Sequence, residues 1–226
     1  MNVLLVQPNC CFQTLPQSAP LGLLSIAAYI KQHGFQVRVY DRNVEKISFE
    51  KVMRVFRPDA VGVAVTSVTH IKDGVAVSHR FRRDGIPVIW GGHMASVVPE
   101  MVLREGGADY TVIGEGEITF FELLRVIESK SDVSQVKGIA YLDGMGALRL
   151  TPEREFADLA DLPVIDWSLV NPKKYFTPRT NCKRLMYLYA SKGCPGRCAF
   201  CFNESFHHRK CRRRPVDYVM HEIAEL

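Results

Sequence analysis

The stretch AVGVAVTSVTHIKDGVAVSHRFRRDGIPVIWGGH, residues 60–93, decides the fold. It starts with small and β-branched apolar residues at 60–65, a composition typical of a buried strand. Residues 71–83 then carry apolar side chains at helical spacing, and the Asp-Gly pair at 84–85 ends that helix. Residues 87–90 form a second short apolar run, which leads into the sequence GGH. Strand, helix and strand in this order predict one βαβ unit of a parallel sheet.

The same alternation extends on both sides of this stretch, to about residue 130. The predicted strands are residues 3–6, 35–40, 60–65, 87–90 and 109–113, and the predicted helices are residues 21–32, 49–56, 71–83, 97–104 and 119–129. Five strands that alternate with five helices predict an α/β fold with a five-stranded parallel doubly wound sheet, of the Rossmann or flavodoxin-like type. Ligands of such sheets bind beyond the carboxyl ends of the strands, so the loops after the strands form the candidate site.

The alternation stops after this sheet. Residues 136–142 and 147–150 flank the sequence DGMG, which predicts a β-hairpin. Residues 151–180 contain four prolines and little periodicity, as expected of a linker that packs on the surface. A predicted strand at 185–190 then leads into a cysteine-rich loop, and a helix is predicted at 216–226.

We therefore divide the chain into a sheet domain at 1–135, a hairpin and linker at 136–184, and the start of another domain at 185–226. One strand and one helix cannot bury their own apolar faces, so we expect this last domain to be cut short.

The bulk composition is that of an ordinary globular protein, with 226 residues, 47% apolar residues and a net charge of +5. Much of this charge lies in one basic run at 209–214, which we interpret as a solvated approach to the last helix. The alternative is that one arginine of this run steers an anionic cofactor or substrate. We therefore expect no nucleic-acid partner. No apolar stretch is long enough to predict a membrane span. Seven cysteines without a secretory signal indicate a reducing, cytoplasmic location, where clustered cysteines more often bind metal than form disulfides.

Three of these cysteines, Cys194, Cys198 and Cys201, have the spacing C-x3-C-x2-C. Three thiolates on one short loop can hold three corners of an iron–sulfur cluster and leave one iron open to a substrate. The alternative is a zinc site with Cys211, His207 or His208 as the fourth ligand, although zinc ribbons usually use two C-x2-C pairs and this chain has one. Unligated thiols are a third possibility.

Two glycine-rich loops follow the fourth and fifth predicted strands. The sequence WGGH covers residues 90–93, and GEGE covers residues 114–117. Glycines at strand ends let the backbone approach a bulky planar or phosphorylated ligand, although each loop alone could be a simple turn. Asp41, at the end of the second strand, could suggest a dinucleotide site. The loop at 8–20 contains no G-x-G-x-x-G, however, so that interpretation lacks its phosphate-binding element.

The cysteine segment resembles the radical S-adenosylmethionine superfamily, whose signature has this spacing and an aromatic residue, here Phe200, before the last cysteine. The resemblance implies a (β/α) barrel of which this chain holds the first βα unit. It also implies a [4Fe–4S] cluster on Cys194, Cys198 and Cys201. The open iron would bind S-adenosylmethionine, and one-electron reduction would release a 5′-deoxyadenosyl radical.

The order of PLGL at 20–23, WGGH, Pro99-Glu100 and GEGE-x-T resembles the cobalamin-binding domain that precedes the radical domain in one large subfamily. The chain lacks the D-x-H-x-x-G motif, so the resemblance implies cobalt without a histidine ligand. The loop at 66–69 would line the lower face of the corrin, or its hydroxyls could simply cap the next helix. The implied cofactor contacts are Thr66, Ser67, Thr69, Gly91, Gly92, His93, Gly114, Glu115, Gly116, Glu117 and Phe200.

The resemblance implies an enzyme that catalyses methyl transfer or a ring-forming oxidation. Its substrate would be a small molecule, a lipid or a tetrapyrrole-like compound, and its partner would be a one-electron reductant such as flavodoxin or ferredoxin. Two alternatives stay open: an inactive or corrinoid-binding fragment, and a zinc-bearing α/β interaction protein. Because most of an adenosyl pocket would lie on later strands, we expect weak or no turnover from this chain alone.

Overall fold

The computed structural model describes residues 1–11, 18–175 and 186–225. Within these residues the main sheet has seven strands in the order β2-β1-β3-β4-β5-β6-β7. The strands are β1 (Asn2–Gln7), β2 (Gln36–Asp41), β3 (Ala60–Ala64), β4 (Val88–Gly91), β5 (Tyr110–Val112), β6 (Ile139–Leu142) and β7 (Leu148–Leu150). The first five are parallel, and β6 and β7 are antiparallel. The order 2-1-3-4-5 is flavodoxin-like and confirms the predicted fold class.

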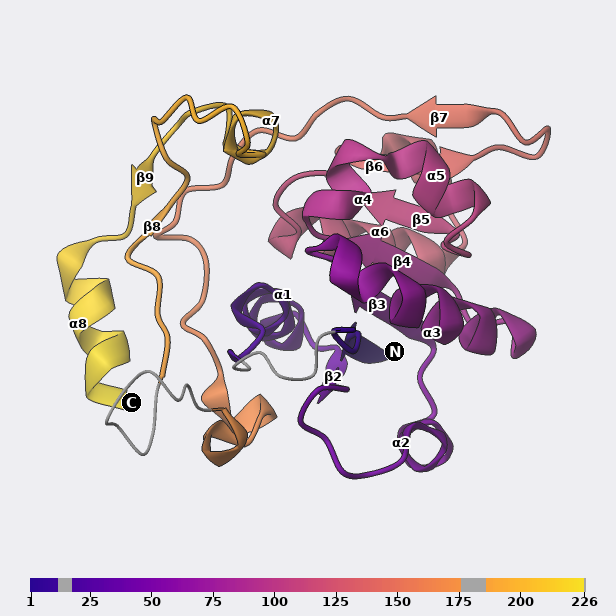
Figure 1. The fold of residues 1–226 in the computed structure, drawn as a ribbon, viewed down its shortest axis with the longest axis horizontal. Helices are drawn as coiled ribbons and strands as arrows, with labels where there is room; N and C mark the ends of the chain where they lie inside the picture. The colour runs from indigo at the N-terminus through magenta and orange to yellow at the C-terminus, as the bar shows by residue number, and fades with distance from the viewer. Residues whose placement is uncertain (12–17, 176–185, 226) are drawn as a thin grey trace.

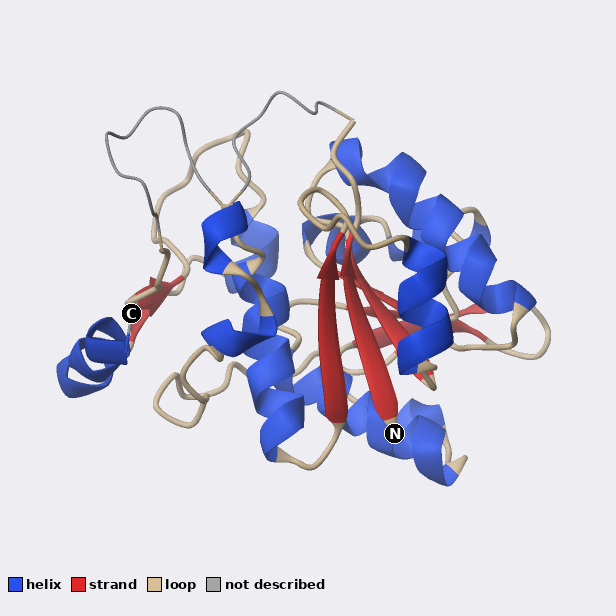
Figure 2. Cartoon of the chain, turned by 90° about the horizontal axis from the view of Figure 1, so that it is seen from below, coloured by secondary structure: helices blue, strands red, loops and turns tan. Residues whose placement is uncertain are grey.

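Helices cover both faces of the sheet (Figure 2). They are α1 (Leu21–Gln32) and α6 (Glu117–Ser129) on one face, and α2 (Phe49–Phe56), α3 (Ile71–Arg83), α4 (His93–Val97) and α5 (Pro99–Arg104) on the other. Successive side chains of β1 pack into the hydrophobic cores on opposite faces of the sheet, because the side chains of a strand alternate between its two faces. Leu5 belongs to the cluster with α1 and α6, and Leu4 to the cluster with α2 and α3.

Close packing of α6 on the sheet depends on a glycine in β3. A Cβ on Gly62 would lie 2.7 Å from Leu5 Cδ2 and 2.9 Å from the Phe120 ring. On the opposite face, the buried Trp90 indole donates a hydrogen bond of 2.7 Å to Ser78 Oγ. These two contacts hold α6 and α3 against opposite faces of the sheet, next to β3 and β4, whose following loops form part of the candidate site.

Three details differ from the sequence prediction. The helix predicted at 97–104 begins at Pro99, as α5, and an unpredicted helix, α4, ends at Val97 before it, because Pro99 disfavours helical geometry at the preceding residue. Helix α6 begins two residues earlier than predicted, at Glu117. The predicted hairpin is present, and its first strand pairs with β5, so it extends the sheet.

The segment expected to be a surface linker is partly core. Leu159 and Leu162 are buried, and Ile165 and Tyr175 join the core beneath α1 and α6. The Tyr175 hydroxyl also donates to Asp41 Oδ2 at 3.2 Å. Short 3-10 turns occur at Val68–His70 (η1), Val133–Gln135 (η2), Trp167–Leu169 (η3) and Pro172–Lys174 (η4).

The C-terminal segment lies beside α1, as Figure 1 shows in orange and yellow. It consists of β8 (Ser191–Lys192), α7 (Asn203–His207), β9 (Arg212–Arg213) and α8 (Val216–Glu225). The strand predicted at 185–190 is wrong over 186–190, where the chain has no strand partner, and the antiparallel β8–β9 pair follows it instead. Leu185 and Cys182 lie outside the described residues. None of the described helices has the length and hydrophobicity of a membrane span.

Candidate functional site

A cavity of about 770 Å³ lies at the carboxyl ends of the parallel strands. Its lining includes every residue of the sheet domain predicted to contact a cofactor: Thr66, Ser67, Thr69, Gly91, Gly92, His93, Gly114, Glu115, Gly116 and Glu117. The C-terminal segment closes one side with Tyr189, Lys192, Gly193 and His207. The sheet topology explains the convergence, because parallel strands deliver all their following loops to one edge.

Two glycines keep the cavity wall free of side chains. Gly92 has φ +96°, and a Cβ there would lie 3.0 Å from the Val65 carbonyl oxygen. Gly114 has φ +78° and open space where a side chain would project. Left-handed backbone favours glycine, and the exposed peptide groups can approach a broad, flat ligand closely. This part of the cavity therefore presents backbone at Gly114, and corrin contact there stays a prediction.

The hydroxyl loop after β3 is internally bonded. Ser67 Oγ accepts hydrogen bonds from the Thr69 amide at 3.3 Å and from Thr69 Oγ1 at 3.1 Å, so it caps the turn η1. Thr66 Oγ1 lies 3.4 Å from His70 Nδ1. Burial lowers the pKa of His70 below its ordinary value, against the opposing charges of Asp41 and Asp73. Capping is thus one role of this loop, and corrin contact by its hydroxyls stays a prediction.

His93 stands between the glycine loop and the C-terminal segment. Its ring centroid lies 3.6 Å from that of Phe202 and 4.7 Å from that of Phe206. Burial is the main reason that the pKa of His93 is lowered, and it outweighs a hydrogen bond with the Thr66 backbone. The imidazole therefore lines the cavity as a neutral, packed ring.

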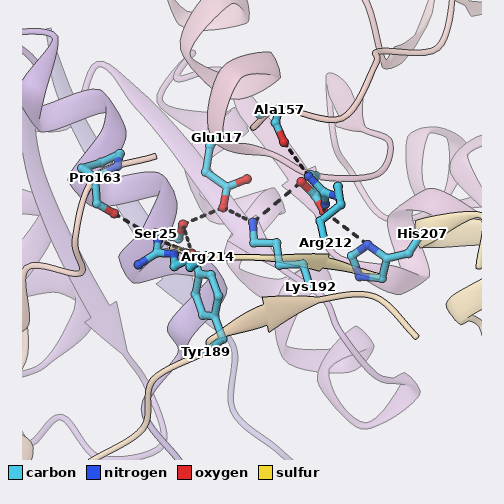
Figure 3. Close-up of polar contacts among 10 residues, drawn as sticks. Ser25, Glu117, Ala157, Pro163, Tyr189, Lys192, His207, Arg212 and Arg214 are labelled. Carbon is cyan, nitrogen blue, oxygen red and sulfur yellow. Dashed lines mark hydrogen bonds and ion pairs between the residues drawn. The ribbon is translucent and has the colours of Figure 1, made fainter. Parts of the chain in front are cut away.

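The side chains of Glu115 and Glu117 contact cations from the C-terminal segment, as Figure 3 shows for Glu117 and Lys192. Lys192 Nζ lies 2.6 Å from Glu117 Oε1, and Arg212 bonds Glu115. The contacts of Lys192 and His207 with these carboxylates were not predicted from the sequence. The basic run was expected in solvent, whereas Arg212 is half-buried and Arg214 is buried. The one available signal was the proximity of these residues to the cysteines.

The cysteine loop, residues 194–202, is exposed and does not line the cavity. A Cβ on Gly196 would lie 3.3 Å from Cys194 Sγ and 3.9 Å from Cys198 Sγ, so this glycine leaves room beside both sulfurs. No three side chains of His, Cys, Asp or Glu converge as a metal site in the described part of the chain. Phe200 is 92% exposed. The donor set suits an iron–sulfur cluster in chemistry and in spacing, and the ligand assignment stays a prediction.

Comparison with known proteins identifies the sheet domain. The model of the B12 binding domain matches residues 15–124. Residues 15–124 thus resemble a B12-binding domain, and the sheet domain is given that name below. This domain contributes β2 to β5 with their carboxyl-terminal loops, and thus most of the cavity wall.

Relatives extend the match beyond the B12-binding domain. The chain is 27% identical to cytidylyl-2-hydroxyethylphosphonate methyltransferase of Streptomyces wedmorensis, over 100% of this chain and 52% of that protein. It is 27% identical to anaerobic magnesium-protoporphyrin IX monomethyl ester cyclase of Synechocystis, over 90% of this chain and 42% of that protein. The chain thus spans about half the length of these relatives.

A solved structure shares the fold over the full chain. It is the radical S-adenosylmethionine methyltransferase TsrM of Kitasatospora setae, with cobalamin and a [4Fe–4S] cluster bound. The TM-score is 0.74 at 21% identity, over 100% of this chain and 45% of that one. The match to the B12-binding domain agrees with the predicted cobalamin-binding fold, and the likeness in fold to this solved structure extends over the C-terminal segment.

Proposed function

We propose that the chain binds a corrinoid in the cavity of the B12-binding domain, next to a [4Fe–4S] cluster held by Cys194, Cys198 and Cys201. One observation carries the proposal. The residues that flank the cysteine loop, among them Lys192, Gly193 and His207, line the same cavity as the glycine loops after β4 and β5. A corrinoid in the cavity would therefore lie close to metal held on that loop.

The proposed activity is methyl transfer in a radical S-adenosylmethionine reaction, supported by the methyltransferases among the relatives and solved structures. A ring-forming oxidation is the second candidate, because the Synechocystis relative is a cyclase. When bound, the cluster would supply the electron that cleaves S-adenosylmethionine, and the corrinoid would carry the methyl group. The same proposal includes a substrate that is a small molecule, a lipid or a tetrapyrrole-like compound. It also includes flavodoxin or ferredoxin as the reductant, and a cytoplasmic location.

The residues of this chain would hold and orient these groups. Gly92 and Gly114 would admit the corrin edge, since neither presents a side chain to it. The loop at 66–69 would face one side of the ring without a histidine ligand. Phe200, which is exposed one residue before Cys201, would cover a cofactor bound at the cluster.

Anaerobic reconstitution with iron, sulfide and hydroxocobalamin tests the proposal. We expect about four irons and four sulfides per chain, as in a [4Fe–4S] cluster, and loss of both in Cys198→Ala. The matched control is Cys11→Ala, because Cys11 is exposed and lies outside the cysteine loop. Tight binding of zinc without labile sulfide would contradict the cluster and favour the interaction-protein alternative. Corrinoid retention without a cluster would favour the corrinoid-binding alternative.

A further inference from the structure

Five charged or ionisable side chains meet between the B12-binding domain and the C-terminal segment. We call them the junction cluster: Glu115, Glu117, Lys192, His207 and Arg212. Lys192 Nζ lies 2.6 Å from Glu117 Oε1 and 3.8 Å from Glu115 Oε2. His207 Nδ1 lies 3.2 Å from Glu115 Oε1, which Arg212 also contacts. Figure 3 shows Lys192 pointing toward Glu117, with Arg212 and His207 on its other side.

The junction cluster is largely shielded from solvent. The side chains of Glu117, Glu115 and Lys192 are 6%, 11% and 15% exposed. Burial alone would raise the pKa of Glu115, but the contact with His207 and the charges of Lys192 and Arg212 outweigh it and lower the pKa. Charge pairs in such surroundings interact more strongly than surface pairs, and loss of one partner leaves a buried charge uncompensated.

The cations of the junction cluster bracket the cysteine loop. Lys192 lies in β8, two residues before Cys194, and Arg212 lies in β9. The two residues are paired across the hairpin, so the loop leaves and returns at one point. Glu115 thus contacts the cations at both ends of the loop, and Glu117 contacts Lys192 at its first end.

Backbone packing makes the base of the cysteine loop compact. Gly193 has φ +84°, and a Cβ there would lie 1.9 Å from the Lys210 carbonyl oxygen. Asn203 Nδ2 donates a hydrogen bond of 2.5 Å to the Cys194 carbonyl oxygen. A displacement of Lys192 or Arg212 would therefore be passed to the first cysteine.

We propose that Glu115 and Glu117 are positioning residues that dock the cysteine loop onto the B12-binding domain and so set the separation between cluster and corrinoid. This inference rests on the proposed function for the two cofactors, whereas docking itself is a property of the chain without them. Their carboxylates act through Lys192, His207 and Arg212 and need not touch either cofactor.

Hydrogen exchange of the cofactor-free full chain tests the docking. We expect Glu117→Gln to accelerate amide exchange in residues 191–213 by about tenfold while strands β1 to β5 keep their protection. The control is Glu50→Gln, which removes one partner of the exposed pair with Arg80. In the double variant Glu117→Gln/Lys192→Met we expect partial recovery, because no unpaired charge is left at that contact. Unchanged exchange in residues 191–213 of Glu117→Gln would overturn the proposal, as would acceleration spread over the whole sheet.

Magnetic coupling between cob(II)alamin and the reduced cluster tests the positioning. In the reconstituted chain we expect Glu115→Gln/Glu117→Gln to weaken the coupling per loaded molecule, measured by electron paramagnetic resonance, with iron and cobalt contents determined in parallel. Coupling equal to that of the unmodified chain would overturn the positioning role. An unmodified chain that binds neither cofactor would contradict the proposed function, and the exchange experiment would still decide the docking.

Discussion

The imidazole of His93 stacks on the ring of Phe202, with centroids 3.6 Å apart and planes inclined by 31°. His93 begins α4, directly after the glycine loop, and Phe202 ends the cysteine loop. The B12-binding domain and the cysteine loop therefore share an aromatic contact at the cavity, in addition to the charged contacts of the junction cluster.

Removal of the Phe202 ring should raise the pKa of His93 toward its ordinary value. Burial is the main cause that lowers this pKa, and Phe202 supplies part of the burial. We expect Phe202→Ala to show a higher His93 pKa in a titration followed by nuclear magnetic resonance. Phe200→Ala is the matched control, since Phe200 is almost fully exposed in the same loop and its removal should leave the titration unchanged. Equal effects of the two variants would show that Phe202 does not bury His93.

Acid should weaken the docked segment in two steps. The folded-state pKa of His93 lies below its ordinary value of 6.5, so neutral His93 contributes stability above pH 6.5 that is lost as the pH falls below it. The pKa of Glu115 lies below its ordinary value of 4.5, so its contribution is lost only as the pH falls below 4.5. Urea unfolding at a series of pH values should show both losses. Phe202→Ala should reduce the first step, and His70, whose pKa is also lowered by burial, should account for the rest.

Gly193→Ala should disrupt the hairpin that carries the cysteines. Its Cβ would overlap the Lys210 carbonyl oxygen, and its φ of +84° disfavours any other residue. We expect faster hydrogen exchange in β8 and β9 and a low yield of reconstituted iron. Gly144→Ala, which would meet no atom within 4 Å, should match the unmodified chain in both measurements. A normal iron yield in Gly193→Ala would mean that the base of the loop does not need this geometry.

The buried ion pair of Arg214 and Glu222 should contribute more to stability than exposed charged residues nearby, such as Arg213. Arg214 Nη1 lies 3.1 Å from Glu222 Oε2, the guanidinium stacks over Tyr189 at 4.7 Å, and the two charged side chains are 0% and 1% exposed. Arg214→Met removes one charge of a buried pair, and we expect a loss of about 3–5 kcal/mol in the unfolding free energy of this segment. Arg213→Met, at an exposed position of the same strand, should change it by less than about 0.5 kcal/mol.

The sequence predicts the sheet domain well because its signals are local. Short apolar runs specify strands without help from distant residues, as at residues 3–6 and 60–65, and the Asp-Gly pair at 84–85 likewise marks the end of a helix. The parallel order of the strands follows from the alternation of strands and helices along the chain. The cavity lining was predictable for the same reason, since loops after parallel strands must meet at one edge. The break between α4 and α5 required attention to Pro99, whose effect outweighs the apolar spacing.

The contacts of the junction cluster could not be predicted from the sequence, because they join residues that are far apart along the chain. Glu117 and Lys192 are separated by 75 residues, and Glu115 and Arg212 by 97. A basic run has the same composition whether it is solvated or docked, so the sequence alone favoured solvent. The short strand β8 could not be predicted either, since a two-residue strand forms because it pairs with β9 and not because of its own side chains.

The retention of hydroxocobalamin by the purified chain tests most directly the central claim, that the cavity binds a corrinoid. We expect about one cobalamin per chain after gel filtration. In Thr66→Trp, whose side chain would fill the cavity wall after β3, we expect cobalamin retention to be lost with no change in circular dichroism. Retention by Thr66→Trp with an intact fold, or no retention by the unmodified chain, would contradict the account.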